Sequence, residues 1–346
     1  CYKKLNMKRK NLNAAKLKNV IIKDKKISSI YLRLKSILSK QKKNNLIAVA
    51  VSGGPDSMAL ALLTKTLMYE KKYKVHFLLV DHGIRKNSTK EALNVKNILE
   101  KKEIKLKVLK NYKKISSNIQ KNARDIRYNL LIEYCKKNKI KSILTAHHKE
   151  DQIETFLIRL SRGSGVEGLS SMSQSMKLKY GIKLIRPFLD FKKNEINQVS
   201  RKFFKKTIKD PSNKNKKFLR TNIRELTKIL EKKGLNLDQV IRSIKNISSS
   251  KEAINFYVNR SLKKFVKFRK NETILDLKMF HKEPKEIKFK IINTIVKERA
   301  LSYYPPRSEK VLNLISRFEA NNPKKCTLGG CIFEKKKNQL HVTREF

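Results

Sequence analysis

The stretch Ser52-Gly-Gly-Pro-Asp-Ser57 lies between an apolar, β-branched run and a segment rich in Leu and Ala. Residues 46–51 predict a buried parallel strand, and residues 58–69 predict a helix. A glycine-rich turn between a strand and a helix brings backbone N–H groups and the positive end of the helix dipole close to an anion. The stretch therefore predicts a phosphate-binding loop, and a Gly-Pro turn without a ligand is the alternative.

The loop is not a Walker loop, because that pattern needs a Lys directly before its last hydroxyl residue and none stands there. Asp56, inside the loop, suits a Mg²⁺ ion that bridges phosphates, since Mg²⁺ favours one or two carboxylates together with phosphate oxygens. The loop resembles the S-G-G-x-D-S signature of the PP-loop ATP pyrophosphatase superfamily. That resemblance implies that ATP is split into an adenylate and pyrophosphate, and that the ATP-binding residues are Ser52, Gly53, Gly54, Pro55, Asp56 and Ser57.

The amino-acid composition of the chain indicates which class of molecule it binds. The chain has 346 residues and a formal net charge of +55. Such a charge indicates a polyanion, because each phosphate that Lys or Arg neutralises releases counterions. The alternative is a biased nucleotide composition, since the basic residues are mostly Lys and are accompanied by many Asn and Ile. Nucleic acid is the partner that we expect.

The four cysteines, Cys1, Cys135, Cys326 and Cys331, form no C-x-x-C pair. We therefore expect neither a disulfide framework nor a transition-metal site, and a cytoplasmic location. Because no apolar run has membrane-spanning length, we expect no membrane partner.

Strands and helices alternate along the first two thirds of the chain. This order predicts an α/β fold with a doubly wound, mostly parallel sheet and ligands at the carboxyl ends of the strands. A Ser88–Glu91 capping box is expected to open one helix. Further expected features are helices at 27–40, 88–102, 118–138, 149–161, 192–204 and 218–231, strands at 75–80, 104–109, 142–145 and 182–186, a mobile loop at 162–175 and a turn at 210–213.

Four parts are expected in the chain. Residues 1–26 predict a poorly ordered basic extension, and residues 27–232 a catalytic domain. The helical period and dense Lys of residues 236–300 predict a separate basic helical domain. Residues 301–346 predict a tail with a helix and a hairpin at 326–343.

Acidic residues are scarce, so the cluster of Glu150, Asp151 and Glu154 is informative. These residues follow Thr145-Ala-His-His148 at the end of a predicted strand, and Asp151 and Glu154 share one helix face. The cluster predicts a site for Mg²⁺ or for a substrate ammonium group. One alternative is stabilisation of a helix N-terminus. Another is a transition-metal site formed with His147.

Arg124 and Arg127 also share a helix face and can clamp a phosphate, although an ordinary solvated surface is the alternative. Asp81, at the end of a predicted strand, can meet a ribose hydroxyl or adenine. His82 next to it is as well suited to a structural hydrogen bond as to catalysis.

Together these segments resemble one family, tRNA(Ile)-lysidine synthetase. The matching segments are Ser52 to Ser57, Val80-Asp-His-Gly-Ile-Arg85, Ala123-Arg-Asp-Ile-Arg-Tyr128, Thr145-Ala-His-His-Lys-Glu-Asp-Gln-Ile-Glu-Thr155, Arg162-Gly-Ser-Gly165 with Gly168-Leu169, Arg186-Pro187 and Asp210-Pro-Ser-Asn213. Glu150 departs from the family, which usually has a second Asp there.

The resemblance implies that ATP, with Mg²⁺, adenylates the wobble cytidine of an isoleucine tRNA with a CAU anticodon, and that free L-lysine then displaces AMP. It implies an ATP contact for Asp81 and a catalytic, lysine-binding or Mg²⁺-binding role for Asp56, His147, Asp151 and Glu154. It also implies phosphate or tRNA contacts for Arg124, Arg127, Arg162 and Arg224, and a tRNA-binding role for the basic helical domain at 236–300. A homodimer is one assembly that we allow for. The alternatives are a tRNA thiolation enzyme of the same superfamily and a non-catalytic basic RNA-binding protein.

Overall fold

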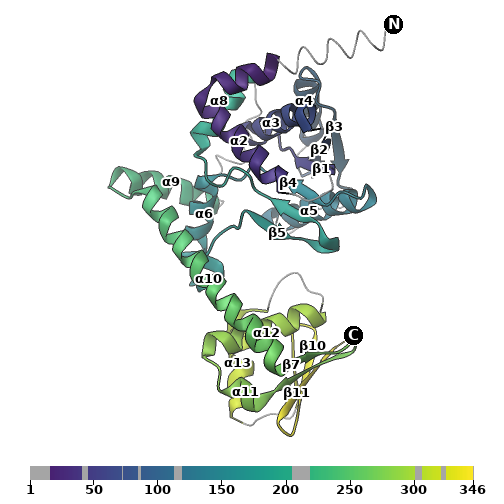
Figure 1. The fold of residues 1–346 in the computed structure, drawn as a ribbon, viewed down its shortest axis with the longest axis vertical. Coiled ribbons are helices and arrows are strands. Elements are labelled where there is room, and N and C mark those ends of the chain that lie inside the picture. Colours follow the sequence, from purple (N-terminus) through teal and green to yellow (C-terminus); the bar gives the residue numbers. More distant parts are fainter. Residues whose placement is uncertain are drawn as a thin grey trace. The chain divides into compact units, whose positions relative to one another are not determined.

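A computed structural model describes residues 16–40, 46–71, 73–84, 87–112, 119–204, 219–300, 306–320 and 325–345. The chain forms two compact units, Cys1–Ile244 and Lys245–Phe346 (Figure 1). The predicted turn at 210–213 and residues 1–15 of the expected extension lie outside the described residues. In the part of the chain that is described, no helix has both the length and the apolar character needed to cross a membrane.

The first unit is built on a six-stranded sheet with the order β3-β2-β1-β4-β6-β5. All neighbouring strands are parallel except β5, which runs antiparallel to β6 at one edge. The predicted α/β fold is therefore confirmed. The strands are β1 (Leu46–Ala50), β2 (Lys74–Asp81), β3 (Leu106–Lys110), β4 (Ser142–Leu144), β5 (Ser175–Lys177) and β6 (Lys183–Ile185).

Strand β1 lies inside this sheet and is buried on both faces. Ile47 and Val49 belong to one hydrophobic cluster, whereas Ala48 belongs to another. This is why the strand appears in the sequence as a continuous apolar run.

The helices of the unit are α2 (Lys25–Ser39), α3 (Pro55–Lys71), α4 (Ser88–Glu100), α5 (Ile119–Lys137), α6 (Lys149–Leu160), α7 (Val166–Leu169), α8 (Lys193–Phe203) and α9 (Leu219–Lys232), with a 3₁₀ turn, η1 (Lys179–Gly181).

Two local predictions in this unit are wrong. Residues 16–23 are helical, and Ile21 is fully buried in the core, so the expected disordered extension does not reach residue 26. Burial of an apolar side chain offsets the entropy lost when the backbone is ordered. The capping box at Ser88 also does not form, because Asn87 occupies the N-cap position and its side chain makes no capping hydrogen bond.

The second unit contains a five-stranded antiparallel sheet with the order β7-β8-β11-β10-β9. The predicted hairpin is present as β10 and β11, but the expected division between a helical domain at 236–300 and a tail at 301–346 is wrong. Strands β7 and β8 come from the first segment and pair with each other, and β8 also pairs with β11 of the second. The elements are β7 (Val266–Phe268), β8 (Glu272–Asp276), α11 (Leu277–His281), α12 (Lys285–Ala300), α13 (Ser308–Glu319), β9 (Lys325–Leu328), β10 (Cys331–Lys336) and β11 (Gln339–Arg344).

The sheet and helices of the second unit share one hydrophobic core, in which Leu275, Ile291, Val311 and Phe333 are fully buried. Helix α10 (Leu237–Phe265) contains the boundary between the units. Its first turns pack on α6, where Ile241 and Ile244 bury Ile153. The helix therefore belongs in part to the first unit and not only to a separate helical domain.

Candidate active site

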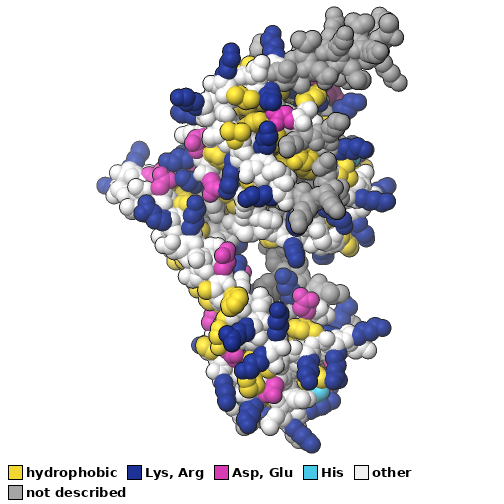
Figure 2. Space-filling view, in the orientation of Figure 1, with side chains coloured by type: hydrophobic (Ala, Val, Ile, Leu, Met, Phe, Trp, Pro, Cys, Tyr) yellow, Lys and Arg dark blue, Asp and Glu magenta, His cyan; other side chains and the backbone are white. Residues whose placement is uncertain are grey.

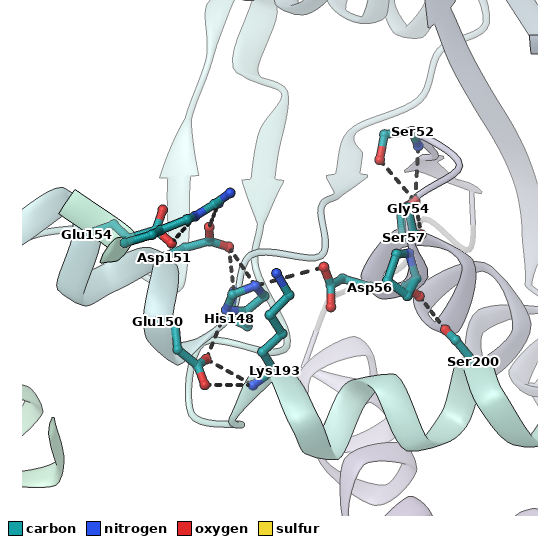
Figure 3. A network of polar contacts seen from close by, with 12 residues as sticks. Ser52, Gly54, Asp56, Ser57, His148, Glu150, Asp151, Glu154, Lys193 and Ser200 are labelled. Atoms are coloured by element: carbon teal, nitrogen blue, oxygen red, sulfur yellow. Dashed lines mark hydrogen bonds and ion pairs between the residues drawn. The ribbon is translucent and has the colours of Figure 1, made fainter. Parts of the chain in front are cut away.

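The phosphate-binding loop joins β1 to α3 and is held in shape by Ser57. The backbone nitrogen of Ser52 donates to Ser57 Oγ (3.1 Å), and Ser57 Oγ donates to the carbonyl oxygen of Gly54 (2.9 Å) (Figure 3). Gly53 has a φ of 84°, which a residue with a side chain rarely adopts. These bonds fix the turn at the N-terminus of α3, where helix N–H groups and the helix dipole favour an anion.

Asp56 stands in the first turn of α3 with one buried carboxylate oxygen, Oδ1. Among the described residues, no donor forms a hydrogen bond to this oxygen. Burial raises the pKa of Asp56, while the positive charges of His148 and Lys193 act in the opposite direction. A buried carboxylate oxygen without a donor is suited to a cation, so the residues present fit a Mg²⁺ ion shared with ATP phosphates.

No further protein carboxylate is required for such an ion, because Mg²⁺ usually keeps waters and substrate phosphates as ligands. In the described ranges, no group of three or more His, Cys, Asp or Glu side chains is arranged to hold a metal ion.

His148 joins the phosphate loop to the acidic cluster. Its side chain is 4% exposed, with Nε2 3.9 Å from Asp56 Oδ2 and 3.5 Å from Asp151 Oδ2, and Nδ1 3.0 Å from Glu150 Oε2. Burial favours the neutral ring, but these three carboxylates outweigh burial and raise the pKa of His148. The imidazole therefore lies between Asp56, Glu150 and Asp151, whose charges favour its protonated form (Figure 3).

Glu150 has a role that its sequence position did not reveal. Both of its carboxylate oxygens accept a hydrogen bond from the backbone nitrogen of Lys193, at 3.0 and 2.9 Å. Lys193 is the first residue of α8, so Glu150 caps this helix from 43 positions away in the sequence. Burial would raise the pKa of Glu150, but contacts with His148 and with backbone N–H groups lower it.

Asp151 and Glu154 lie at the start of α6 and already have cationic partners. Glu154 accepts hydrogen bonds from Nε of Arg220 (2.8 Å) and Nε of Arg224 (2.5 Å), and its side chain is only 6% exposed. Asp151 Oδ1 lies 3.4 Å from Arg220 Nη2. The cluster is therefore a network of ion pairs and not a set of open carboxylates.

The carboxylate of Asp151 also stabilises the start of its own helix. Its Oδ2 atom accepts a hydrogen bond from the backbone nitrogen of His148 at 3.1 Å. Stabilisation of a helix N-terminus, the alternative raised from the sequence, is thus part of its role. Burial opposes ionisation, but His148, His147 and Arg220 lower the pKa of Asp151.

His147 is kept neutral. Burial, followed by the positive charges of Arg186, Arg124 and Arg220, lowers its pKa, although Asp151 acts against this. Its Nδ1 atom lies 3.0 Å from Thr145 Oγ1. A neutral imidazole near several guanidinium groups can accept a proton or a hydrogen bond.

Asp81 is 5% exposed, and its two oxygens accept hydrogen bonds from the backbone nitrogen of Gly83 (3.0 Å) and from Thr89 Oγ1 (2.8 Å). The structure thus gives Asp81 a local role at the start of α4. Burial would raise the pKa of Asp81, but hydrogen bonds from Ser88, Thr89 and Gly83 lower it. The contact with ATP remains a prediction.

Arg124 and Arg127, which were predicted to clamp one phosphate, each contact a different residue of the protein. Arg127 donates from Nε to His82 Nε2 (3.2 Å), and the Arg124 guanidinium lies 5.1 Å from the ring centre of Tyr128. Both arginines are exposed. Burial and the charge of Arg127 lower the pKa of His82 to about 4, which favours the structural role for this histidine.

Arg162 is exposed at the start of the glycine- and serine-rich segment. This segment, expected to be a mobile loop, contains α7 and is tied to α6. Arg159 Nη1 donates to the carbonyl oxygens of Gly168 (2.6 Å) and Ser171 (3.2 Å), and Ser171 Oγ donates to that of Gln152 (3.0 Å).

Sequence reasoning missed four residues of the site. A signal existed for Arg220, which is spaced i,i+4 from Arg224 on one helix, and for His148, the second histidine of a pair. For Lys193 and Arg159, one of many basic residues each, the sequence offers no signal.

Known proteins similar to this chain agree with the geometry. A PP-loop domain family matches residues 27–230. A tRNA(Ile)-lysidine synthase of Wolbachia pipientis wMel is 35% identical over 307 residues, which are 87% of this chain and 71% of that protein. A tRNA(Ile)-lysidine synthase of Orientia tsutsugamushi (strain Boryong) is 32% identical over 317 residues, which are 88% of this chain and 70% of that protein.

Among solved structures, the U34-tRNA thiolase NcsA from Methanococcus maripaludis with its [4Fe-4S] cluster is similar in fold. The TM-score is 0.53 at 19% identity, over 65% of this chain and 80% of that one. In the described part of this chain, Cys135 lies in the first unit and only Cys326 and Cys331 in the second, and none of the three belongs to a metal-binding group. The similarity is therefore one of fold.

Proposed function

We propose that this chain, which belongs to the tRNA(Ile)-lysidine synthase family of PP-loop proteins, adenylates the wobble cytidine of a CAU-anticodon isoleucine tRNA and attaches free lysine to it. The observation that carries the proposal is the contact of His148 with both Asp56 and Asp151. It supports an active site in which the ATP-binding loop and the acidic cluster act on the same substrate atoms.

In the first step, the C2 carbonyl oxygen of the cytidine attacks the α-phosphorus of ATP and pyrophosphate leaves. The loop from Ser52 to Ser57 holds the phosphates through its backbone N–H groups and the dipole of α3. Asp56 Oδ1 is the oxygen that would hold Mg²⁺, and the ion would neutralise charge on the departing pyrophosphate.

In the second step, the ε-amine of lysine attacks C2 and AMP leaves. We assign lysine recognition to Asp151 and Glu154, whose carboxylates hold cations in this structure. In our assignment, the Arg220 and Arg224 groups that occupy them shift toward the lysine carboxylate when lysine binds. The neutral His147 is the group that we assign to accept a hydrogen bond from the attacking amine, whose proton passes to solvent.

The tRNA backbone is expected to contact basic residues of both units. Figure 2 shows Lys and Arg side chains over the visible face of each unit, with few acidic side chains between them. On α10, Phe256 is 74% exposed and Tyr257 is 46% exposed, and Arg260 follows within one turn. Exposed aromatic rings next to cations can stack on unpaired bases. Arg124, Arg127 and Arg162 are exposed and remain our candidates for phosphate contacts in the first unit.

The test is incubation of the purified chain with CAU-anticodon tRNA, ATP and labelled lysine, with a sulfur donor in a parallel reaction. We expect lysine label in the tRNA and release of AMP and pyrophosphate. Asp151→Ala and Glu154→Ala should lose incorporation, and wild-type turnover by either would contradict the assignment. Absence of tRNA-dependent ATP consumption would instead favour a non-catalytic RNA-binding protein.

The salt dependence of tRNA binding and the light scattering of the chain complete the test. The tRNA affinity should fall as salt rises, because backbone contacts release counterions. An affinity independent of salt would contradict the role of the basic surface. We infer a cytoplasmic location, where tRNA, ATP and free lysine occur together, and the homodimer is checked by light scattering.

A further inference from the structure

The phosphate loop contains no lysine of its own, although phosphate-binding loops commonly use one to neutralise the phosphates. In the structure, Lys193 at the start of α8 lies beside the phosphate loop. Figure 3 shows its side chain extending from the start of α8 toward the space between His148 and Asp56. Among the described residues, no carboxylate forms an ion pair with the Lys193 ammonium group. Within the described ranges, this positive charge therefore stands beside the loop without a salt-bridge partner, although its field reaches Asp56.

Two contacts fix the position of Lys193 relative to the loop. Ser200 Oγ donates to the carbonyl oxygen of Pro55, which joins α8 to the first residue of α3. Ile196 and Val199 of α8 are buried in the same hydrophobic cluster as residues of α3. At the start of the helix, Glu150 holds the backbone nitrogen of Lys193. The lysine is therefore placed by packing and by a cap, not by an ion pair of its own side chain.

We propose that Lys193 is a phosphate-binding residue for ATP, supplied by α8 in place of a lysine within the loop, and that Glu150 is the residue that positions it. The inference rests on the proposed use of ATP and adds the group that binds its triphosphate. The electrostatic effect of Lys193 on Asp56 is consistent with an ammonium group close to the loop. A charge-assisted hydrogen bond to a phosphate oxygen needs this arrangement.

The test is equilibrium binding of Mg-ATP and of adenosine to the full chain, measured by calorimetry. For Lys193→Ala, we expect the Kd for ATP to rise roughly tenfold or more, because a hydrogen bond to a charged group is lost. The Kd for adenosine should stay within about twofold, since adenosine has no phosphate, and Lys193→Arg should recover part of the ATP affinity.

The matched control is Lys192→Ala, which removes the same charge one residue away. The Lys192 ammonium lies 3.4 Å from Asp238 Oδ2, and this pair is exposed. Unchanged ATP affinity of Lys193→Ala, or an equal loss in both variants, would overturn the inference and leave the proposed function standing. A wild-type chain that does not bind ATP would overturn both. If Lys193→Ala does not fold, Lys193→Gln, which keeps most of the side-chain length, gives the same comparison.

Discussion

Glu150 accepts two hydrogen bonds from the backbone nitrogen of Lys193, and this contact attaches the start of α8 to the start of α6. Both helices carry residues of the candidate active site. An Asp at this position would have a side chain one methylene shorter, so the same contact would require the two helix ends to lie closer together.

Glu150→Ala should lower the free energy of unfolding by about 1 kcal/mol, the typical cost of a lost helix cap. Glu150→Gln keeps an acceptor oxygen and should lose less. Urea denaturation measures both. Glu252→Ala, on the exposed surface of α10, is the control and should stay within about 0.5 kcal/mol of wild type. Equal losses in the Ala and Gln variants would argue against the cap.

Glu154→Ala should destabilise the first unit by about 3 kcal/mol, because Arg220 and Arg224 lose their nearer carboxylate and keep only the longer contacts with Asp151. The value is at the low end for buried pairs, since the Arg220 and Arg224 side chains are 36% and 30% exposed. Chemical denaturation gives the measurement, with the exposed Glu231→Ala on α9 as the control. A loss below 1 kcal/mol would show that the pairs contribute little.

Acid should destabilise the chain in part through His82, whose pKa is lowered to about 4 from an ordinary value of 6.5. The folded state keeps the ring neutral, so this contribution is complete above pH 6.5 and is lost as pH falls toward 4. His82→Asn should therefore lose less stability than wild type over this window, by on the order of 2 kcal/mol. Thermal unfolding at pH 7, 5.5 and 4.5 tests this, and parallel curves would contradict it.

The proposed attachment of lysine needs no iron–sulfur cluster. Cys326→Ala should therefore retain lysine incorporation within about twofold, and Cys331→Ser should do so at a temperature where it remains folded, since Cys331 is fully buried. The purified chain should lack the visible absorption of a cluster. Loss of activity together with loss of bound iron would favour the thiolation alternative.

The second unit should fold only as a whole. A chain that ends at residue 300 lacks β9, β10 and β11, so β8 loses the partner to which it is paired from Glu272 to Asp276. We expect proteases to cut residues 245–300 rapidly in this variant, while the first unit stays resistant and still binds ATP. A separate helical domain at 236–300 would instead stay protected. The fragment 245–346 is the positive control and should fold.

Much of the first unit could be predicted because its signals are local. The strand before Ser52, the loop and the helix after it follow from apolar runs and glycines in one short stretch. Strands β7 and β8 were missed because their pairing partners cannot be found from periodicity. Strand β8 pairs with β11, which lies more than sixty positions later, and β7 pairs with β8.

The sequence by itself determined the chemical inventory: a phosphate loop, an acidic cluster in a basic chain and the order in which they occur. Only the tertiary structure decided how these groups are used. In the folded chain, His148 lies among three carboxylates and Lys193 lies beside the loop. Arg220 and Arg224 form ion pairs with the acidic cluster. The physical reason is that electrostatic contacts depend on distance in space. Parallel strands bring distant segments together at one edge of the sheet, where residue spacing along the chain carries no information.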